Sequence, residues 1–218
     1  MTSSVAPALV ARVREEAGAF FAGARGSHDW DHTERVRRLA LRIGRKEKAD
    51  LGVLELAALL HDVGREAEDR SRGRDCHAKA GAALARTVLE RNGVDRATAE
   101  AVVHCIATHR YRGRAVPESL EAKVLFDADK LDSIGAVGVG RAFLFAGEVG
   151  ARLHDKDVDV AKTKPYTRED TAYREYLVKL GRIRDRMTTR EGRRLAAGRH
   201  RFMAAFFARL HKETDGVV

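Results

Sequence analysis

Residues 54–64 read LELAALLHDVG, a run that is apolar on nearly every side before it ends in a histidine, an aspartate and a glycine. A helix that is apolar around its whole circumference is normally buried, so this segment is predicted to be the central helix of a helical core. Gly64 favours the end of that helix, because glycine readily adopts the left-handed conformation found at helix C-termini. His61 and Asp62 are therefore expected at the buried end of the central helix.

The sequence on both sides repeats apolar residues at intervals of three and four, which is the period of an amphipathic helix. Capping residues precede several of these runs, with Ser27 or Asp29 before the second and Thr188 or Thr189 before the last. Helices are predicted over residues 9–21, 29–44, 54–63, 78–89, 95–109, 120–131, 134–149, 171–187 and 190–212.

The domain organisation follows from this pattern. No segment of useful length alternates with the period of a strand, and there is no internal repeat or low-complexity linker. We therefore predict a single all-α domain over residues 1–218. Two segments interrupt the helices: residues 66–75 are predicted to form a charged loop, and residues 152–165, where Lys and Asp alternate, are either a mobile flap or disordered.

The composition indicates a globular chain that does not enter a membrane. Its 218 residues are 44% hydrophobic and 33% charged, and a chain of this length buries roughly 70% of its unfolded surface. No apolar run approaches the roughly 18 residues of a spanning helix. Arg12 and Arg14 lie where a secretory signal needs apolar residues. Cys76 and Cys105 lie far apart, as expected for reduced thiols. We therefore expect a cytoplasmic protein.

The charge is basic, with 41 Lys and Arg against 32 Asp and Glu and a net charge of +9. Such an excess can indicate a nucleic-acid partner. The basic residues are scattered among acidic ones, which favours solvated helix faces over a binding stripe. A nucleic-acid-binding protein or a nuclease is therefore the less favoured alternative, and a ligand that carries phosphate is also compatible with this charge.

Two histidines and two aspartates form the main candidate site. A His and an Asp side by side at the end of an apolar helix are costly to bury unless a cation binds them. His32 lies near the start of the preceding predicted helix, and Asp129 lies near the end of a later one, so the four side chains can converge in a bundle core with His61 and Asp62. Alternatively, the doublet is a helix-terminal His followed by a turn Asp. Two nitrogen and two oxygen ligands suit Mn, Fe, Co, Ni, Mg or Zn and do not select one.

These residues resemble the H…HD…D signature of the HD-domain metal-dependent phosphohydrolases. Residues 59–64 look like the central helix of that family, and residues 128–131 look like its last metal-ligand segment. The core resemblance covers about residues 25–150, and residues 127–136 are similar to the small bacterial YedJ/YpgQ-like branch, which continues into a helical extension over about residues 166–213. No Gly-Tyr-Pro motif is present, so a cyclic-dinucleotide role is not supported.

The resemblance implies an all-α helical bundle and a divalent metal held by His32, His61, Asp62 and Asp129, and it leaves open whether one or two metal ions bind. It also implies hydrolysis of a phosphoester or phosphoanhydride, in which a metal-activated water attacks phosphorus. The substrate class is a nucleotide or a similar small phosphorylated metabolite. Release of phosphate and release of pyrophosphate both stay open, as does the formation of a homodimer.

Three further residues are candidates for catalysis beside Asp62. Asp132 lies three residues after Asp129 and can orient a water or a ligand histidine, or it is a solvated aspartate at a helix end. His77 and His109 can bind a second cation, hold a phosphate or act as a general acid, or they are hydrogen-bonded core histidines.

Cationic residues near these positions are candidates for binding the substrate phosphate. Lys130 follows a predicted ligand, Arg35 lies one turn beyond His32, and Arg112 belongs to a basic loop. Arg65, directly after Gly64, is also a candidate for binding the substrate phosphate.

Overall fold

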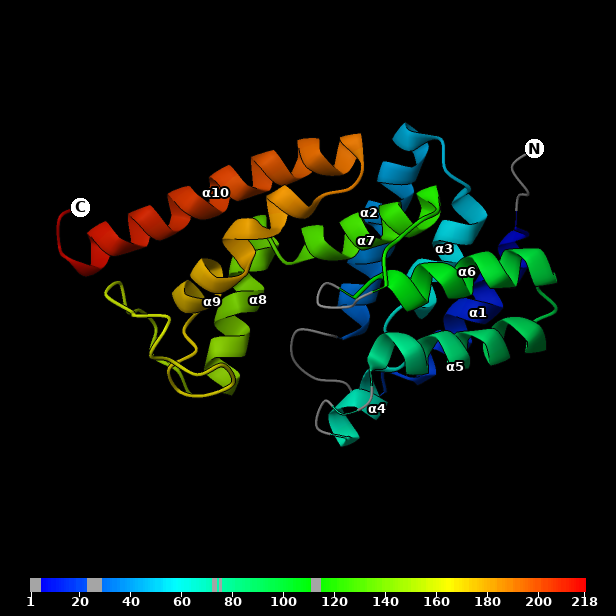
Figure 1. Cartoon of the computed structure of the whole chain (residues 1–218), viewed down its shortest axis with the longest axis horizontal. Helices are drawn as coiled ribbons and strands as arrows, with labels where there is room; N and C mark the ends of the chain where they lie inside the picture. The colour runs from blue at the N-terminus through cyan, green and yellow to red at the C-terminus, as the bar shows by residue number, and fades with distance from the viewer. Residues whose placement is uncertain (1–4, 23–28, 72–73, 75, 111–114) are drawn as a thin grey trace. The chain divides into compact units, whose positions relative to one another are not determined.

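The structure is a computed structural model that describes residues 5–22, 29–71, 74, 76–110 and 115–218 (Figure 1). Within these residues every regular element is a helix, which confirms the all-α prediction. The elements are α1 (Pro7–Ala19), α2 (Trp30–Glu47), α3 (Leu51–Leu60), α4 (Arg65–Arg70), α5 (His77–Arg91), α6 (Arg96–Thr108), α7 (Leu120–Asp132), α8 (Gly135–Glu148), α9 (Ala172–Val178), the 3-10 helix η2 (Leu180–Arg186) and α10 (Arg190–Thr214).

The chain divides into two compact units, residues 1–129 and residues 130–218. In the first unit, α3 packs against α1, α2 and α6, and α5 runs alongside α6 (Figure 1). Residues 56–60 of α3 have no exposed surface, as the apolar sequence predicts. The starts of these helices are set locally, because Asp29, Asp50 and Asp95 each accept hydrogen bonds from backbone N–H groups in the first turn of the helix that follows.

A close approach between backbones holds α5 against the turn that follows α3. A Cβ added at Gly64 would lie 2.3 Å from the carbonyl oxygen of His77 and 2.4 Å from the backbone nitrogen of Gly81. Only a residue without a side chain fits there, and Gly81 on α5 is the matching small residue. This contact brings the start of α5 beside His61 and Asp62.

Helix α4 occupies the first part of the segment predicted as a charged loop. Arg65–Arg70 forms one and a half turns with Glu66 and Glu68 in its first turn, where acidic residues stabilise the positive end of a helix dipole. The loop prediction was therefore wrong for residues 66–70.

The second unit consists of the end of α7 together with α8, α9, η2 and α10. Phe207 of α10 contacts the rings of Phe143, Tyr173 and Tyr176. The predicted helix over residues 171–187 is wrong as a single element, because it breaks at Lys179 (φ −140°, ψ −59°) and continues as the tighter η2. Gly181 in this segment lowers helix propensity.

Residues 151–171 form a series of turns joined to α9 by a buried arginine. Arg174 pairs with Asp170 at 2.7 Å and donates to the hydroxyl of Thr163 at 2.6 Å and to its carbonyl oxygen at 3.1 Å. Asp170 also accepts the backbone N–H of Tyr166, at 2.8 Å. One buried ion pair thus fixes the course of the segment predicted as a flap or disordered.

Across the described part of the chain, no helix combines the length and apolarity needed to cross a membrane.

Candidate metal centre

Six histidine and aspartate side chains gather in the first unit, and each is at most 7% exposed. Each is placed at or near the end of a helix, which is why residues so far apart in sequence can meet. They are His32 in the first turn of α2, His61 and Asp62 directly after α3, His77 at the first position of α5, His109 directly after α6, and Asp129 in α7.

His32, His61 and Asp129 bring one ligand atom each to within 4.8 Å of one another. The Nε2 atoms of His32 and His61 lie 3.3 Å apart, and His32 Nε2 is 3.5 Å from Asp129 Oδ1. Asp62 Oδ2 faces the same two nitrogens, at 3.6 Å from His32 and 3.7 Å from His61. The structure therefore brings the four predicted metal ligands together.

The other oxygen of Asp62 faces a second pair of histidines. Asp62 Oδ1 lies 3.5 Å from His109 Nε2 and 3.8 Å from His77 Nε2, and these three side chains form a second group with metal-ligand geometry. Asp62 is thus the carboxylate common to both groups, with one oxygen for each.

Three of the histidines are held in the same tautomer. The Nδ1–H of His61 donates to the carbonyl oxygen of Ala58 at 2.8 Å, and that of His109 donates to Ile106 at 2.6 Å. The Nδ1–H of His77 donates to Glu68 at 2.6 Å. Because these oxygens can only accept, the proton is on Nδ1 and the Nε2 lone pair points into the cluster.

Burial keeps two of these rings neutral. Desolvation lowers the pKa of His61 to about 4, although Asp62 acts in the opposite direction. Desolvation, reinforced by the charge of Arg65, lowers the pKa of His77 to about 2. A neutral imidazole is the form that binds metals. The donor set, with its two Nε2 atoms facing each other across 3.3 Å, fits a divalent cation.

The lowered pKa values predict that the metal-free protein loses stability in weak acid. Below about pH 6.5 the unfolded chain protonates His61 and His77 while the folded chain does not, so the free energy of unfolding falls as the pH drops from 6.5 to about 4. Each histidine contributes at most about 1.4 kcal/mol per pH unit. Urea unfolding of chelator-treated protein at pH 7, 6 and 5 measures this slope. His61→Gln should flatten it, and an unchanged slope in that variant would contradict the assignment.

Two arginines and a glutamate border the cluster. Arg65 Nε is 3.0 Å from Asp62 Oδ1, and Arg65 Nη1 is 3.1 Å from Glu68. Glu68 also binds Arg110 Nη2, at 2.9 Å. Glu68 was missed by the sequence reasoning, and the only available signal was the run of charges that follows the His-Asp doublet.

The remaining predicted site residues are Asp132, Lys130, Arg35 and Arg112. Asp132 is buried and pairs with Arg141 at 2.8 Å within the second unit. Lys130 follows Asp129 in α7 and is half-buried, as is Arg35 in α2. Arg112 lies outside the described residues.

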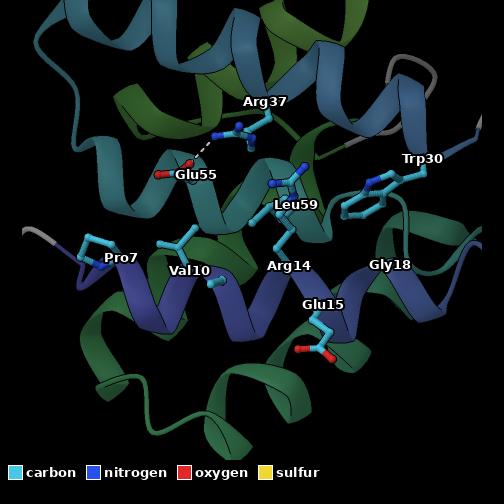
Figure 2. Close-up of a pocket in the computed structure, with 10 residues that line it drawn as sticks. Pro7, Val10, Arg14, Glu15, Gly18, Trp30, Arg37, Glu55 and Leu59 are labelled. Carbon is cyan, nitrogen blue, oxygen red and sulfur yellow. Dashed lines mark hydrogen bonds and ion pairs between the residues drawn. The ribbon is translucent and has the colours of Figure 1, made fainter.

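A hollow of about 580 Å³ lies elsewhere in the first unit (Figure 2). It is lined by α1, α2 and α3, with Trp30, Arg14 and the ion pair between Arg37 and Glu55 around it. None of the six cluster residues lines it, so the candidate site is identified by its chemistry and not by this cavity.

Comparison with known proteins gives the family. The HD domain family model matches residues 29–134. The Bacillus subtilis protein YpgQ is 39% identical over 195 residues, covering 87% of this chain and 86% of YpgQ. A structure of YpgQ in complex with ADP has a TM-score of 0.74 at 34% identity and covers 94% of this chain and 95% of that one.

Two more distant relatives complete the comparison. An HD-superfamily hydrolase from Bacillus thuringiensis has a TM-score of 0.74 at 26% identity, over 94% of this chain and 96% of its own. Ribonuclease Y of Borreliella burgdorferi is 32% identical over 114 residues, which is 52% of this chain but only 20% of that enzyme. The match to YpgQ extends well beyond the HD segment, and we conclude that the chain belongs to the HD domain family, among the HD-superfamily hydrolases.

Proposed function

We propose that the protein is a metal-dependent phosphohydrolase that cleaves a phosphoester or phosphoanhydride of a nucleotide or a similar small phosphorylated metabolite. The observation that supports this most is the position of Asp62, whose two carboxylate oxygens face two different pairs of buried histidine nitrogens. A purely structural aspartate does not need four imidazoles around it.

His32, His61, Asp62 and Asp129 are the residues that would hold a divalent cation. When bound, the cation supplies Lewis acidity, which acidifies water and offsets charge on a phosphoryl oxygen. The ligand set does not select among Mn, Fe, Co, Ni, Mg and Zn.

His77 and His109 are assigned to positioning the attacking water on the other side of Asp62. With Nδ1 protonated, each presents an Nε2 lone pair beside Asp62 Oδ1. Such a nitrogen accepts a hydrogen bond, so each ring can orient the attacking water, and His109 can also take its proton. Neither a general-acid nor a general-base role fits His77, because burial lowers its pKa to about 2, which leaves the ring unprotonated at neutral pH and too weak a base to deprotonate water. We also propose that Asp132 orients a water or a ligand histidine, as its position after Asp129 predicts.

The substrate phosphate would be bound by arginine and lysine side chains. Arg65 and Arg110 both contact Glu68 at the edge of the cluster, and guanidinium groups bind phosphate oxygens in bidentate fashion. Lys130, Arg35 and Arg112 are further candidates on their sequence positions. The complex of YpgQ with ADP supports a nucleotide as the ligand class.

A nuclease is the second candidate, favoured by the likeness to ribonuclease Y. That likeness covers only a fifth of the ribonuclease, so most of that enzyme has no counterpart in the match.

We also propose that residues 1–218 work as one domain in the cytoplasm. The thiols of Cys76 and Cys105, which form no disulfide, would stay reduced there. We further propose that the protein can form a homodimer.

The test is a substrate panel on chelated protein reconstituted with each cation in turn. The panel contains a phosphatase reporter, nucleoside mono-, di- and triphosphates, and a labelled RNA oligonucleotide. We expect turnover of one nucleotide class only when a cation is present, at least about a hundredfold above the chelated sample. Faster cleavage of RNA than of any nucleotide would establish the nuclease instead, and no turnover with any cation would contradict both.

A further inference from the structure

A positively charged side chain, that of Arg65, already lies beside the second group of candidate ligands, Asp62, His77 and His109. Asp62 Oδ1 is the oxygen that faces His77 and His109, and the guanidinium Nε of Arg65 lies 3.0 Å from the same atom. Arg65 is the first residue of α4, three positions after Asp62, so the short turn between them delivers the guanidinium to this carboxylate.

Glu68 keeps the guanidinium in place. Its carboxylate, 13% exposed, binds Arg65 Nη1 at 3.1 Å and accepts the Nδ1–H of His77 at 2.6 Å. Glu68 thus connects the arginine to the histidine of the second group, and Arg110 holds its other oxygen at 2.9 Å.

A guanidinium and a divalent cation compete for Asp62 Oδ1. Like charges a few ångströms apart in a buried site repel strongly, because the effective dielectric constant is far below that of water. The donor atoms of Asp62, His77 and His109 nevertheless lie within 4.8 Å of one another, which suits a metal ion. The second group therefore has ligand atoms that suit a metal ion, but the positive charge of Arg65 beside them opposes the binding of one.

We infer that Arg65 takes the place of a second metal ion, so that the native centre holds one divalent cation and the second group becomes a metal site only when Arg65 is removed. The inference builds on the proposed function, which provides the first cation at His32, His61, Asp62 and Asp129. In the native protein Arg65 contributes a tethered positive charge on the side of Asp62 opposite to that cation.

The experiment counts ions. Full-length protein, Arg65→Ala and Arg65→Gln are titrated with Mn²⁺, and the stoichiometry is measured by elemental analysis and calorimetry. We expect one ion in the native protein and two in both variants, with the affinity for the second ion raised at least about tenfold. Two neighbouring Mn²⁺ ions also couple magnetically, which gives an independent signature by electron paramagnetic resonance.

Two further variants make the count specific. Arg65→Ala combined with His77→Ala should return to one ion, because the second group has then lost a ligand. Arg70→Ala, which removes an exposed arginine paired with Glu66 at the end of the same helix, should keep one ion. Arg65→Gln removes the charge but keeps more of the side chain than alanine does, so a folding defect in Arg65→Ala alone leaves the test intact.

The outcomes separate this inference from the proposed function. Two ions in the native protein, or one ion in both Arg65 variants, would overturn the role of Arg65. If the Asp129→Asn variant, with Arg65 unchanged, still binds one ion, the proposed first site is contradicted. A gain of one ion on removing Arg65 in that same background would still support the inference.

Discussion

Asp62→Asn is expected to abolish both metal binding and hydrolysis. The change keeps the size of a side chain that is 1% exposed but replaces one anionic oxygen by an NH₂ group, which cannot bind a cation. Hydrolysis should fall at least about a thousandfold, because acidification of water from a pKa of 15.7 to about 7 is lost with the metal. Elemental analysis and turnover of the preferred nucleotide, measured on the same sample, check both effects.

Asp31→Asn is the matched control. Asp31 lies beside His32 in the first turn of α2 but is exposed, so its substitution should leave metal content and turnover within about twofold of the native values. Each substitution removes one negative charge, so any binding of RNA should be the same in the Asp62 and Asp31 variants. Activity that survives Asp62→Asn in metal-free buffer would place the reaction elsewhere in the chain.

Gly64→Ala is expected to cause the largest loss of stability. The new Cβ would lie 2.3 Å from the His77 carbonyl oxygen and 2.4 Å from the Gly81 nitrogen, both of which are backbone atoms that cannot rotate away. Helix α5 must then shift, and His77 shifts with it away from Asp62. We expect the free energy of unfolding to fall by about 3 kcal/mol, the upper end of the usual range for overpacking. Urea unfolding of the metal-free protein measures this change.

Gly140→Ala provides the control for the Gly64 variant. Gly140 is exposed in α8, and nothing lies within 4 Å of an added Cβ. Alanine there should raise the free energy of unfolding by about 0.5–1 kcal/mol through helix propensity. A Gly64→Ala protein as stable as the native one would show that α5 tolerates separation from the turn after α3.

The local features of the chain could be predicted well because they depend on neighbouring residues. The period of apolar residues located α2, α6 and α10, and Asp29 and Thr189 begin two of these helices with side-chain hydrogen bonds, as their residue types indicate. The prediction over residues 171–187 failed because apolar period alone does not distinguish an α-helix from one that breaks at Lys179 and tightens into η2.

The helical class and the candidate ligands His32, His61, Asp62 and Asp129 could be predicted without the structure, since apolar period and residue type are local properties. The surroundings of Asp62 follow from the folded arrangement of the helices. The contact of Glu68 with His77 and the fit of Gly64 against Gly81 depend on how α4 and α5 pack after α3. Such contacts join residues that no local pattern pairs, because they arise from the packing of whole helices and not from the spacing of residues along the chain.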